Sequence, residues 1–269
     1  MLCVLAVLSV IAVTLIRETR EETRFESAVI DDAKAEALAE AGIQQSMAEL
    51  LIPPGNGAWQ ADGATHELRL GEGSVRVRIE DESGRIDINS ADDATLVSML
   101  ISIGLPNDEA QHLAAAIADY RDPDSIKHPG GAEAFDYEAA GLDHGPKNSP
   151  FDSPEELMQV LGMTPEILKT LYPLITVYSP TREINRQAAS PAVLRALPKS
   201  TFGPEQNLAT AGLGDPVVPV LSAATVVRVT AEAHTRGGGY YIREAILRRS
   251  TLPTQPFNVL SWRRRWPES

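Results

Sequence analysis

Five oxygen-bearing side chains gather in one polar stretch of the sequence, residues 119–150. A segment of this length without a hydrophobic period is uncommon in a compact domain unless it has a function or lacks fixed structure. Carboxylate and amide oxygens are the ligands that a hard cation collects. The stretch therefore predicts a metal-binding loop with these candidate ligands: Asp119, Asp122, Asp124, Glu133 and Asn148.

The residue types favour calcium over other common ions. Acidic side chains brought together repel one another, and holding a long loop in one shape costs conformational entropy. Ca²⁺ offsets both with flexible oxygen coordination, whereas Mg²⁺ demands a more regular ligand set. The five histidines and the single cysteine, Cys3, show no zinc-ligand spacing. The alternative is a solvated loop whose acids cap helices, since Asp152 and Ser153 precede a predicted helix.

Charge and motifs exclude several classes of function. Residues 86–178 carry 16 acidic and 4 basic side chains in a chain of net charge −13. This segment would repel a phosphate backbone at neutral pH. The sequence contains no P-loop, no dinucleotide fingerprint and no G-x-S-x-G elbow. We therefore expect neither an enzyme nor a binder of nucleic acid or of a small-molecule substrate.

The region around the loop has a helical pattern with two helix-turn-helix units, whose turns contain Gly104 and Gly162. Ser90 and Ser153 each precede an acidic residue at capping-box spacing. The two units resemble helix-hairpin-helix motifs, which in many proteins grip DNA through backbone amides and nearby cations. Lys169 is the only cation near the second turn. A compact helical packing unit is therefore preferred, and a DNA-binding or DNA-uptake protein is the alternative.

Residues 1–52 predict one long helix, with Gly42 as its only helix-weakening residue. Residues 1–16 carry no charge but are shorter than the roughly 20 apolar residues that cross a bilayer. A buried core helix, a signal-peptide segment and a membrane anchor are the three interpretations. Basic residues before the run and a small-residue cleavage site after it are both missing. We favour a membrane anchor whose start is truncated.

Alternating apolar and polar residues predict strands on both sides of the helical region. They occupy residues 66–70, 75–79, 225–233, 240–248 and 256–264. The first two strands alone are too few for independent stability, so we expect one sheet interrupted by an insert rather than two separate β units. The predicted boundaries are residues 53–85 and 221–269 for the sheet, and 86–220 for the helical insert.

Several motifs in this order resemble the general secretion pathway protein K family, the minor pseudopilins of bacterial type II secretion systems. The most specific is the series Arg-Asp-Pro-Asp, Gly-Ala-Glu and Lys-Asn. The motifs are Gly84-Arg85-Ile86-Asp87-Ile88-Asn89, Asp119-Tyr120-Arg121-Asp122-Pro123-Asp124, Gly131-Ala132-Glu133, Lys147-Asn148-Ser149-Pro150-Phe151 and Ile175-Thr176-Val177-Tyr178.

The resemblance implies an α+β, pilin-like fold: a long N-terminal helix packed on an antiparallel sheet, with a large inserted helical subdomain of helix-hairpin-helix or SAM-like type. It implies a non-enzymatic subunit that forms or caps the pseudopilus tip with two other minor pseudopilins and helps to initiate assembly of the major pseudopilin. It also implies structural calcium in the helical domain. The expected location is the bacterial inner membrane, with a single-pass anchor and the globular domain in the periplasm.

Overall fold

The computed structural model divides into two compact units. It describes residues 2–53, 57–179, 181, 183–198, 225–252 and 254–265, with side chains from residue 26 onward. Met1–Glu80 and Val227–Ser269 form the first unit, here called the sheet unit. Asp81–Val226 form the second, the helical unit. The predicted insert boundary at residues 220–221 lies outside the described residues.

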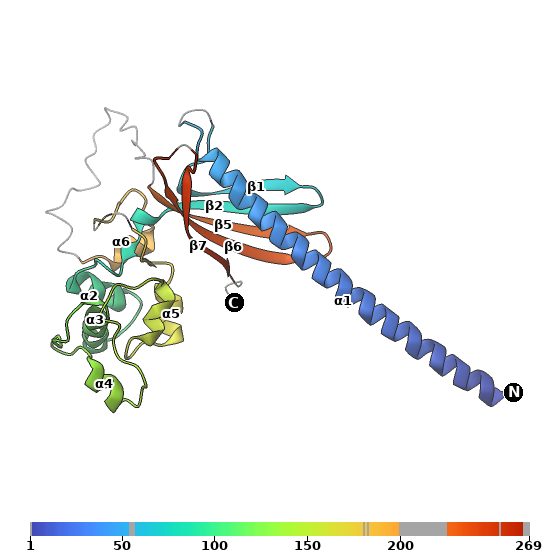
Figure 1. The fold of residues 1–269 in the computed structure, drawn as a ribbon, viewed down its shortest axis with the longest axis horizontal. Helices are drawn as coiled ribbons and strands as arrows, with labels where there is room; N and C mark the ends of the chain where they lie inside the picture. Colours follow the sequence, from blue (N-terminus) through green and yellow to red (C-terminus); the bar gives the residue numbers. More distant parts are fainter. Residues whose placement is uncertain are drawn as a thin grey trace. The chain divides into compact units, whose positions relative to one another are not determined.

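One long helix, α1 (Leu2–Glu49), opens the sheet unit and lies across its sheet (Figure 1). Its buried positions recur every three to four residues, which is the period of one helix face. The fully buried members of this face are Ala35, Ala39, Ile43 and Ser46. The helix ends three residues before the predicted residue 52, immediately ahead of the Pro-Pro-Gly segment.

Gly42 brings α1 into close contact with the sheet. A Cβ at this position would lie 2.8 Å from Val75 Cγ1 and 3.3 Å from Ala231 Cβ. Any larger side chain would push the helix away from the strands. The residue that weakens the helix in isolation therefore permits its packing on the sheet.

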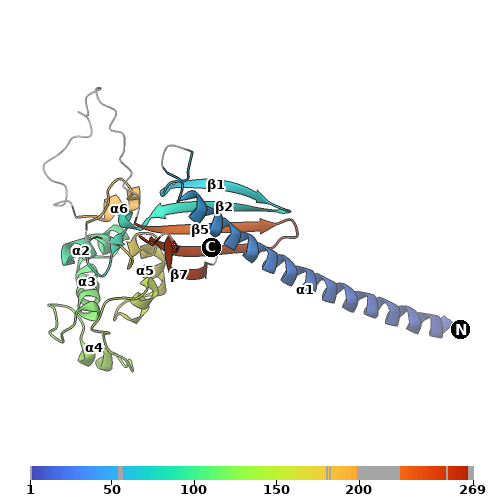
Figure 2. The ribbon, with the colours of Figure 1, turned by 45° about the horizontal axis from the view of Figure 1, so that its top comes forward.

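The sheet has five strands in the order β1-β2-β5-β6-β7. β1 pairs antiparallel with β2, and β6 pairs antiparallel with β7. Because β2 and β5 are neighbours while the helical unit lies between them in sequence, one sheet is interrupted by an insert, as predicted (Figure 2). The strands are β1 (Asp62–Leu70), β2 (Gly73–Asp81), β5 (Val226–Thr235), β6 (Tyr240–Arg249) and β7 (Phe257–Arg265).

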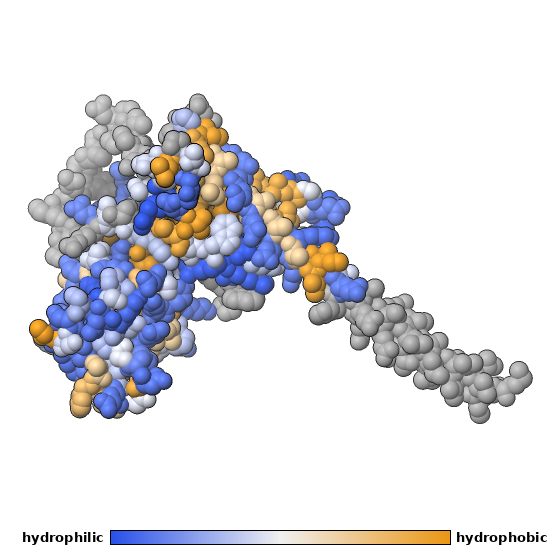
Figure 3. Space-filling model, in the orientation of Figure 1, coloured by the Kyte–Doolittle hydropathy of each residue, from blue (hydrophilic) through white to orange (hydrophobic). Residues whose placement is uncertain are grey.

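Polar contacts flank the apolar face between α1 and β6. Arg243 on β6 is 7% exposed and donates to Glu36 at 2.5 Å and to Glu40 at 3.0 Å. The Tyr241 hydroxyl donates to Glu36 at 2.9 Å. The exposed apolar residues Val29 and Ile30 lie further toward the N-terminus of α1. Figure 3 shows apolar surface on the described part of this helix.

No helix within the described part of the chain has an apolar stretch sufficient to cross a membrane. The side chains of residues 1–16, the predicted anchor, lie outside the described residues. The anchor therefore stays a prediction.

The helical unit consists of short helices around its own apolar core. A two-stranded parallel sheet, which the sequence analysis missed, joins β3 (Ile86–Asp87) to β4 (Ile175–Thr176). The helices are α2 (Asp93–Ser102), α3 (Asn107–Arg121), α4 (Ala134–Ala139), α5 (Pro165–Leu171) and α6 (Pro191–Ala196), with the 3₁₀ helices η1 (Glu82–Gly84) and η2 (Pro154–Gln159).

The predicted helix turns are present, but the predicted capping boxes are wrong. Gly104 (φ 102°) and Gly162 (φ 88°) adopt the left-handed conformation that favours glycine. Asp92, rather than Ser90, caps α2 by accepting from the Thr95 N–H. Ser153 precedes η2 without a side-chain cap bond. Asp92 therefore caps α2 because it directly precedes the first helical residue, Asp93, whereas Ser90 lies too far from it.

Candidate metal centre

The side chain of Asp119 holds the first part of the predicted metal loop in place. It lies in the last turn of α3 and is fully buried. Its Oδ1 accepts the His128 backbone N–H at 3.0 Å, and its Oδ2 accepts the Ala132 N–H at 2.7 Å. A Cβ on Gly131 would lie 2.0 Å from Asp119 Oδ2, so glycine is required there. Backbone donors thus fix the chain from residue 128 to 132 around one carboxylate.

Three of the five predicted ligands have a buried oxygen without a hydrogen-bond partner. Buried polar atoms in folded proteins nearly always have a partner, and exceptions call for an explanation such as a missing ion. Asn148 also adopts φ 51°, which is unusual for a residue other than glycine, while its N–H donates to the Tyr120 carbonyl at 3.0 Å. The three unpartnered atoms are Asp122 Oδ1, Glu133 Oε1 and Asn148 Oδ1.

The carboxylates of the loop repel one another. Burial raises the pKa of Asp122 above its usual range, and the charges of Asp124 and Asp119 raise it further. Burial also raises the pKa of Glu133, with added repulsion from Asp119, Asp122 and Asp124. The fold therefore directs negative charge from several segments toward one region. A bound cation would relieve this repulsion and supply the missing partners.

The remaining two predicted ligands differ from these three. Both oxygens of Asp119 already accept hydrogen bonds. Asp124 is exposed, and its Oδ1 accepts the Ile126 N–H at 2.8 Å. Asp122, Glu133 and Asn148 each offer an unpartnered buried oxygen to a hard cation. Among the described acidic and histidine side chains, those with donor atoms within 4.8 Å of one another are Asp119, Asp122 and His128, so the full set of five ligands stays a prediction.

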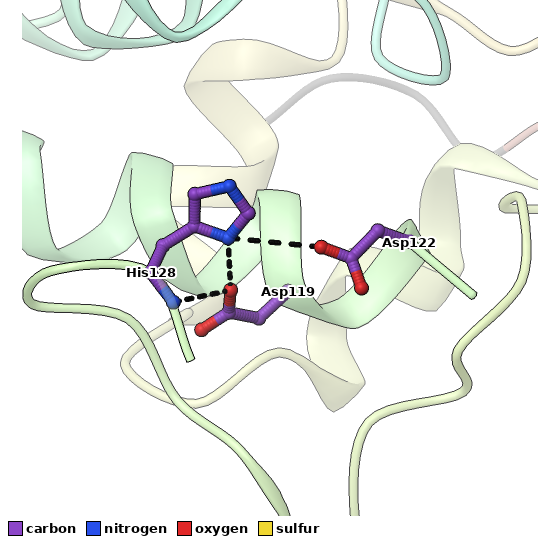
Figure 4. A group of neighbouring side chains, drawn as sticks. All are labelled: Asp119, Asp122 and His128. Carbon is purple, nitrogen blue, oxygen red and sulfur yellow. Dashed lines mark hydrogen bonds and ion pairs between the residues drawn. The ribbon is translucent and has the colours of Figure 1, made fainter. Parts of the chain in front are cut away.

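His128 is a member of this cluster that the sequence analysis missed (Figure 4). Its Nδ1 lies 2.5 Å from Asp119 Oδ1 and 3.6 Å from Asp122 Oδ2. One donor atom from each of Asp119, Asp122 and His128 lies within 4.8 Å of the others. The hydrogen bond to Asp119 is the main reason that the pKa of His128 is raised. No second histidine or cysteine at ligand spacing marks this position in the sequence.

Side chains from two of the motifs noted in the sequence, Asn89 and Lys147, hold the C-terminal part of the loop. Asn89 accepts the Phe151 N–H at 2.8 Å and donates to the Phe151 carbonyl at 2.9 Å. Phe151 stacks on Tyr120 with a ring-centroid separation of 4.8 Å. Lys147 pairs with Asp152 at 2.7 Å and with Glu156 at 3.0 Å. These contacts position Asn148 beside the end of α3.

The predicted metal loop, its supporting motifs and both helix turns fall within a single match to a known family. Residues 78–181 match the family model for protein K of the type II secretion system. This segment is similar to the protein K domain of that system. The resemblance found in the sequence is confirmed, and the predicted function is confirmed at the level of a secretion-system component. Members of the matched family are structural components of a secretion system, and the family is not a known class of enzyme. A comparison with curated proteins finds no significant match.

A solved structure shares the fold over nearly the whole chain. The crystal structure of the GspK–GspI–GspJ complex from the type 2 secretion system of enterotoxigenic Escherichia coli contains a similar chain. The TM-score is 0.60 at 16% identity, with coverage of 93% of this chain and 100% of that chain. Together with the topology, this likeness confirms the predicted pilin-like α+β fold with its helical insert.

Proposed function

We propose that this chain is a minor pseudopilin that forms or caps the tip of the type II secretion pseudopilus and helps to initiate its assembly. The observation that carries the proposal is the protein K domain inserted between β2 and β5 of a sheet packed under a long N-terminal helix. The insert adds bulk to the helix-and-sheet unit. That bulk would hinder a further subunit from stacking above it, which favours a terminal position.

Two other minor pseudopilins are the proposed tip partners. The similar solved chain comes from a complex of three such components, which supports this choice. The exposed pair Val29 and Ile30 on α1 offers apolar surface for helix packing with neighbours. The major pseudopilin is the proposed neighbour below the tip, and residues 1–16 are the proposed anchor in the inner membrane before assembly, with the globular units in the periplasm.

A secretion assay tests this role. Deleting the gene for this chain should remove the type II substrates from the culture medium, and the full chain supplied on a plasmid should restore them. Affinity purification of the full chain should recover two other minor pseudopilins. An unchanged set of secreted proteins in the deletion strain would contradict the proposal.

Calcium is the proposed structural cofactor of the helical unit. The ion would bind oxygens of Asp122, Glu133 and Asn148. The charge of Asp124 acts on Glu133, and Asp119 holds the loop through its hydrogen bonds to backbone N–H groups. When bound, the ion would neutralise the repelling carboxylates and satisfy buried oxygens. It would thereby stabilise the folded loop without taking part in any reaction.

Thermal unfolding in calcium and in excess chelator tests the cofactor. At a free calcium concentration of about 100 times Kd, binding stabilises the fold by about 2.7 kcal/mol. We therefore expect a higher Tm in calcium than in chelator. The Asp122→Ala/Glu133→Ala double variant should lose this difference.

The matched control for that variant is Glu138→Ala/Asp143→Ala, which removes the same charge at two exposed positions. This control should keep the calcium response. Equal melting curves of the unmodified protein in calcium and in chelator would sink the calcium proposal while leaving the secretion role intact.

A further inference from the structure

The cluster at the end of α3 contains a nitrogen donor among its oxygens. His128 Nδ1 lies beside carboxylate oxygens of Asp119 and Asp122, and one donor atom from each residue lies within 4.8 Å of the others. The His128 side chain is 41% exposed, so its ring has room to turn. An imidazole beside unpartnered buried oxygens makes a mixed nitrogen and oxygen donor set.

The donor set bears on which ions the site accepts. Ca²⁺ binds oxygen ligands and gains little from imidazole. First-row transition ions bind imidazole together with carboxylates, and their affinities for such sites follow the Irving–Williams order. We propose that His128 is a ligand of this site and that the site therefore takes first-row divalent transition ions in addition to calcium. This inference rests on the proposed cation site.

The geometry allows the ring to leave Asp119 without opening the loop. The His128 and Ala132 backbone N–H groups donate separately to the two oxygens of Asp119. Neither bond involves the imidazole, so both would remain if the ring turned toward an ion beside Asp122. Replacing the ring should therefore change metal selectivity rather than loop structure.

The test uses Mn²⁺ as the probe, because a directly coordinated imidazole nitrogen produces a ¹⁴N modulation in the electron spin echo of bound Mn²⁺. The full chain should show this modulation. Two variants remove the imidazole: His128→Asn keeps a side-chain donor for Asp119, and His128→Phe keeps a ring. Both should lose the modulation and bind Mn²⁺ about tenfold more weakly or worse, by analogy with other lost metal-site interactions. Their calcium affinity, measured by titration calorimetry, should change less than about twofold.

His112→Asn is the control, since it makes the same change at an exposed histidine outside the cluster. It should retain the ¹⁴N modulation and both affinities. Mn²⁺ that binds to the unmodified chain without ¹⁴N modulation, or with equal affinity to both His128 variants, would overturn the inference and leave the calcium site standing. A chain that binds neither Mn²⁺ nor Ca²⁺ would overturn the inference together with the proposed cation site.

Discussion

In the sheet unit, α1 packs through apolar residues so closely that Gly42 leaves no space for a side chain. In the helical unit, the segment from residue 128 to 132 is held by hydrogen bonds to one buried carboxylate, Asp119. Close apolar packing stabilises the sheet unit, and ion pairs of Arg243 lie at the edge of this packed face. Charge and hydrogen bonding govern this segment of the helical unit.

The difference determines how each region responds to its surroundings. Apolar packing is little affected by calcium or by moderate salt, because it depends on removing surface from water. A loop that concentrates carboxylates is sensitive to cations, because its folded form carries unbalanced repulsion. The helix-and-sheet unit should therefore stay constant while the helical unit responds to the ions around it.

Removing the Asp119 carboxylate should produce the largest effect. Asp119→Ala leaves the His128 and Ala132 N–H groups without their acceptor and should lower the free energy of unfolding of the helical unit by about 1–3 kcal/mol for each. Urea unfolding in chelator measures this loss without any contribution from bound metal. Hydrogen exchange at the Ala132 amide should accelerate, because its acceptor is missing.

Asp124→Ala is the control for this prediction, since it removes the same group from an exposed position with one backbone contact. We expect a loss of about 1 kcal/mol or less. If the two variants proved equally stable, Asp119 would not be the residue that closes the loop.

A larger side chain at residue 42 should give the next largest effect. Gly42→Val must displace α1 from Val75 and Ala231, and overpacking of this kind costs about 1–3 kcal/mol. Ala41→Val, on the exposed side of the same helix, should cost under about 1 kcal/mol. Calcium and chelator should leave both values unchanged, which unfolding experiments in each buffer would show.

The sheet could be predicted from the sequence, because strands such as β1 and β2 alternate over several residues. The pair β3 and β4 could not, since each strand has two residues and its partner lies far along the chain. Ser90 and Asp92 are both good capping residues, and only the position of the helix start selects Asp92. Local periodicity thus identifies long elements, whereas tertiary contacts determine short ones.

The candidate site shows the same limit. Residue type alone identified Asp122, Glu133 and Asn148 as oxygen donors. It could not distinguish Asp119 from Asp124, because the burial of Asp119 depends on which face of α3 packs inward. It also missed His128, whose place beside Asp119 results from closure of the loop by backbone donors.

Loss of the Lys147 charge should have a smaller effect that depends on salt. Lys147 is partly exposed and pairs with Asp152 and Glu156, so Lys147→Met should cost about 0.5–1 kcal/mol at low ionic strength. The cost should shrink in about 1 M salt, where the screening length falls to roughly 3 Å. Lys34→Met, which breaks an exposed pair on α1, is the matched control and should change stability less. A salt-independent loss at Lys147 would point to packing instead of charge.

Removing residues 1–16 should affect the fold least. The fully buried positions in the described part of α1 begin at Ala35, and the helical unit has a separate core. These described contacts lie in other parts of the chain, so we expect the chain without residues 1–16 to keep its circular dichroism spectrum, its Tm and its response to Gly42→Val. The apolar run should affect only where the protein resides, and the shortened chain should leave the membrane fraction for the soluble one. An unfolded spectrum would show that residues 1–16 belong to a core, and the anchor prediction would then be wrong.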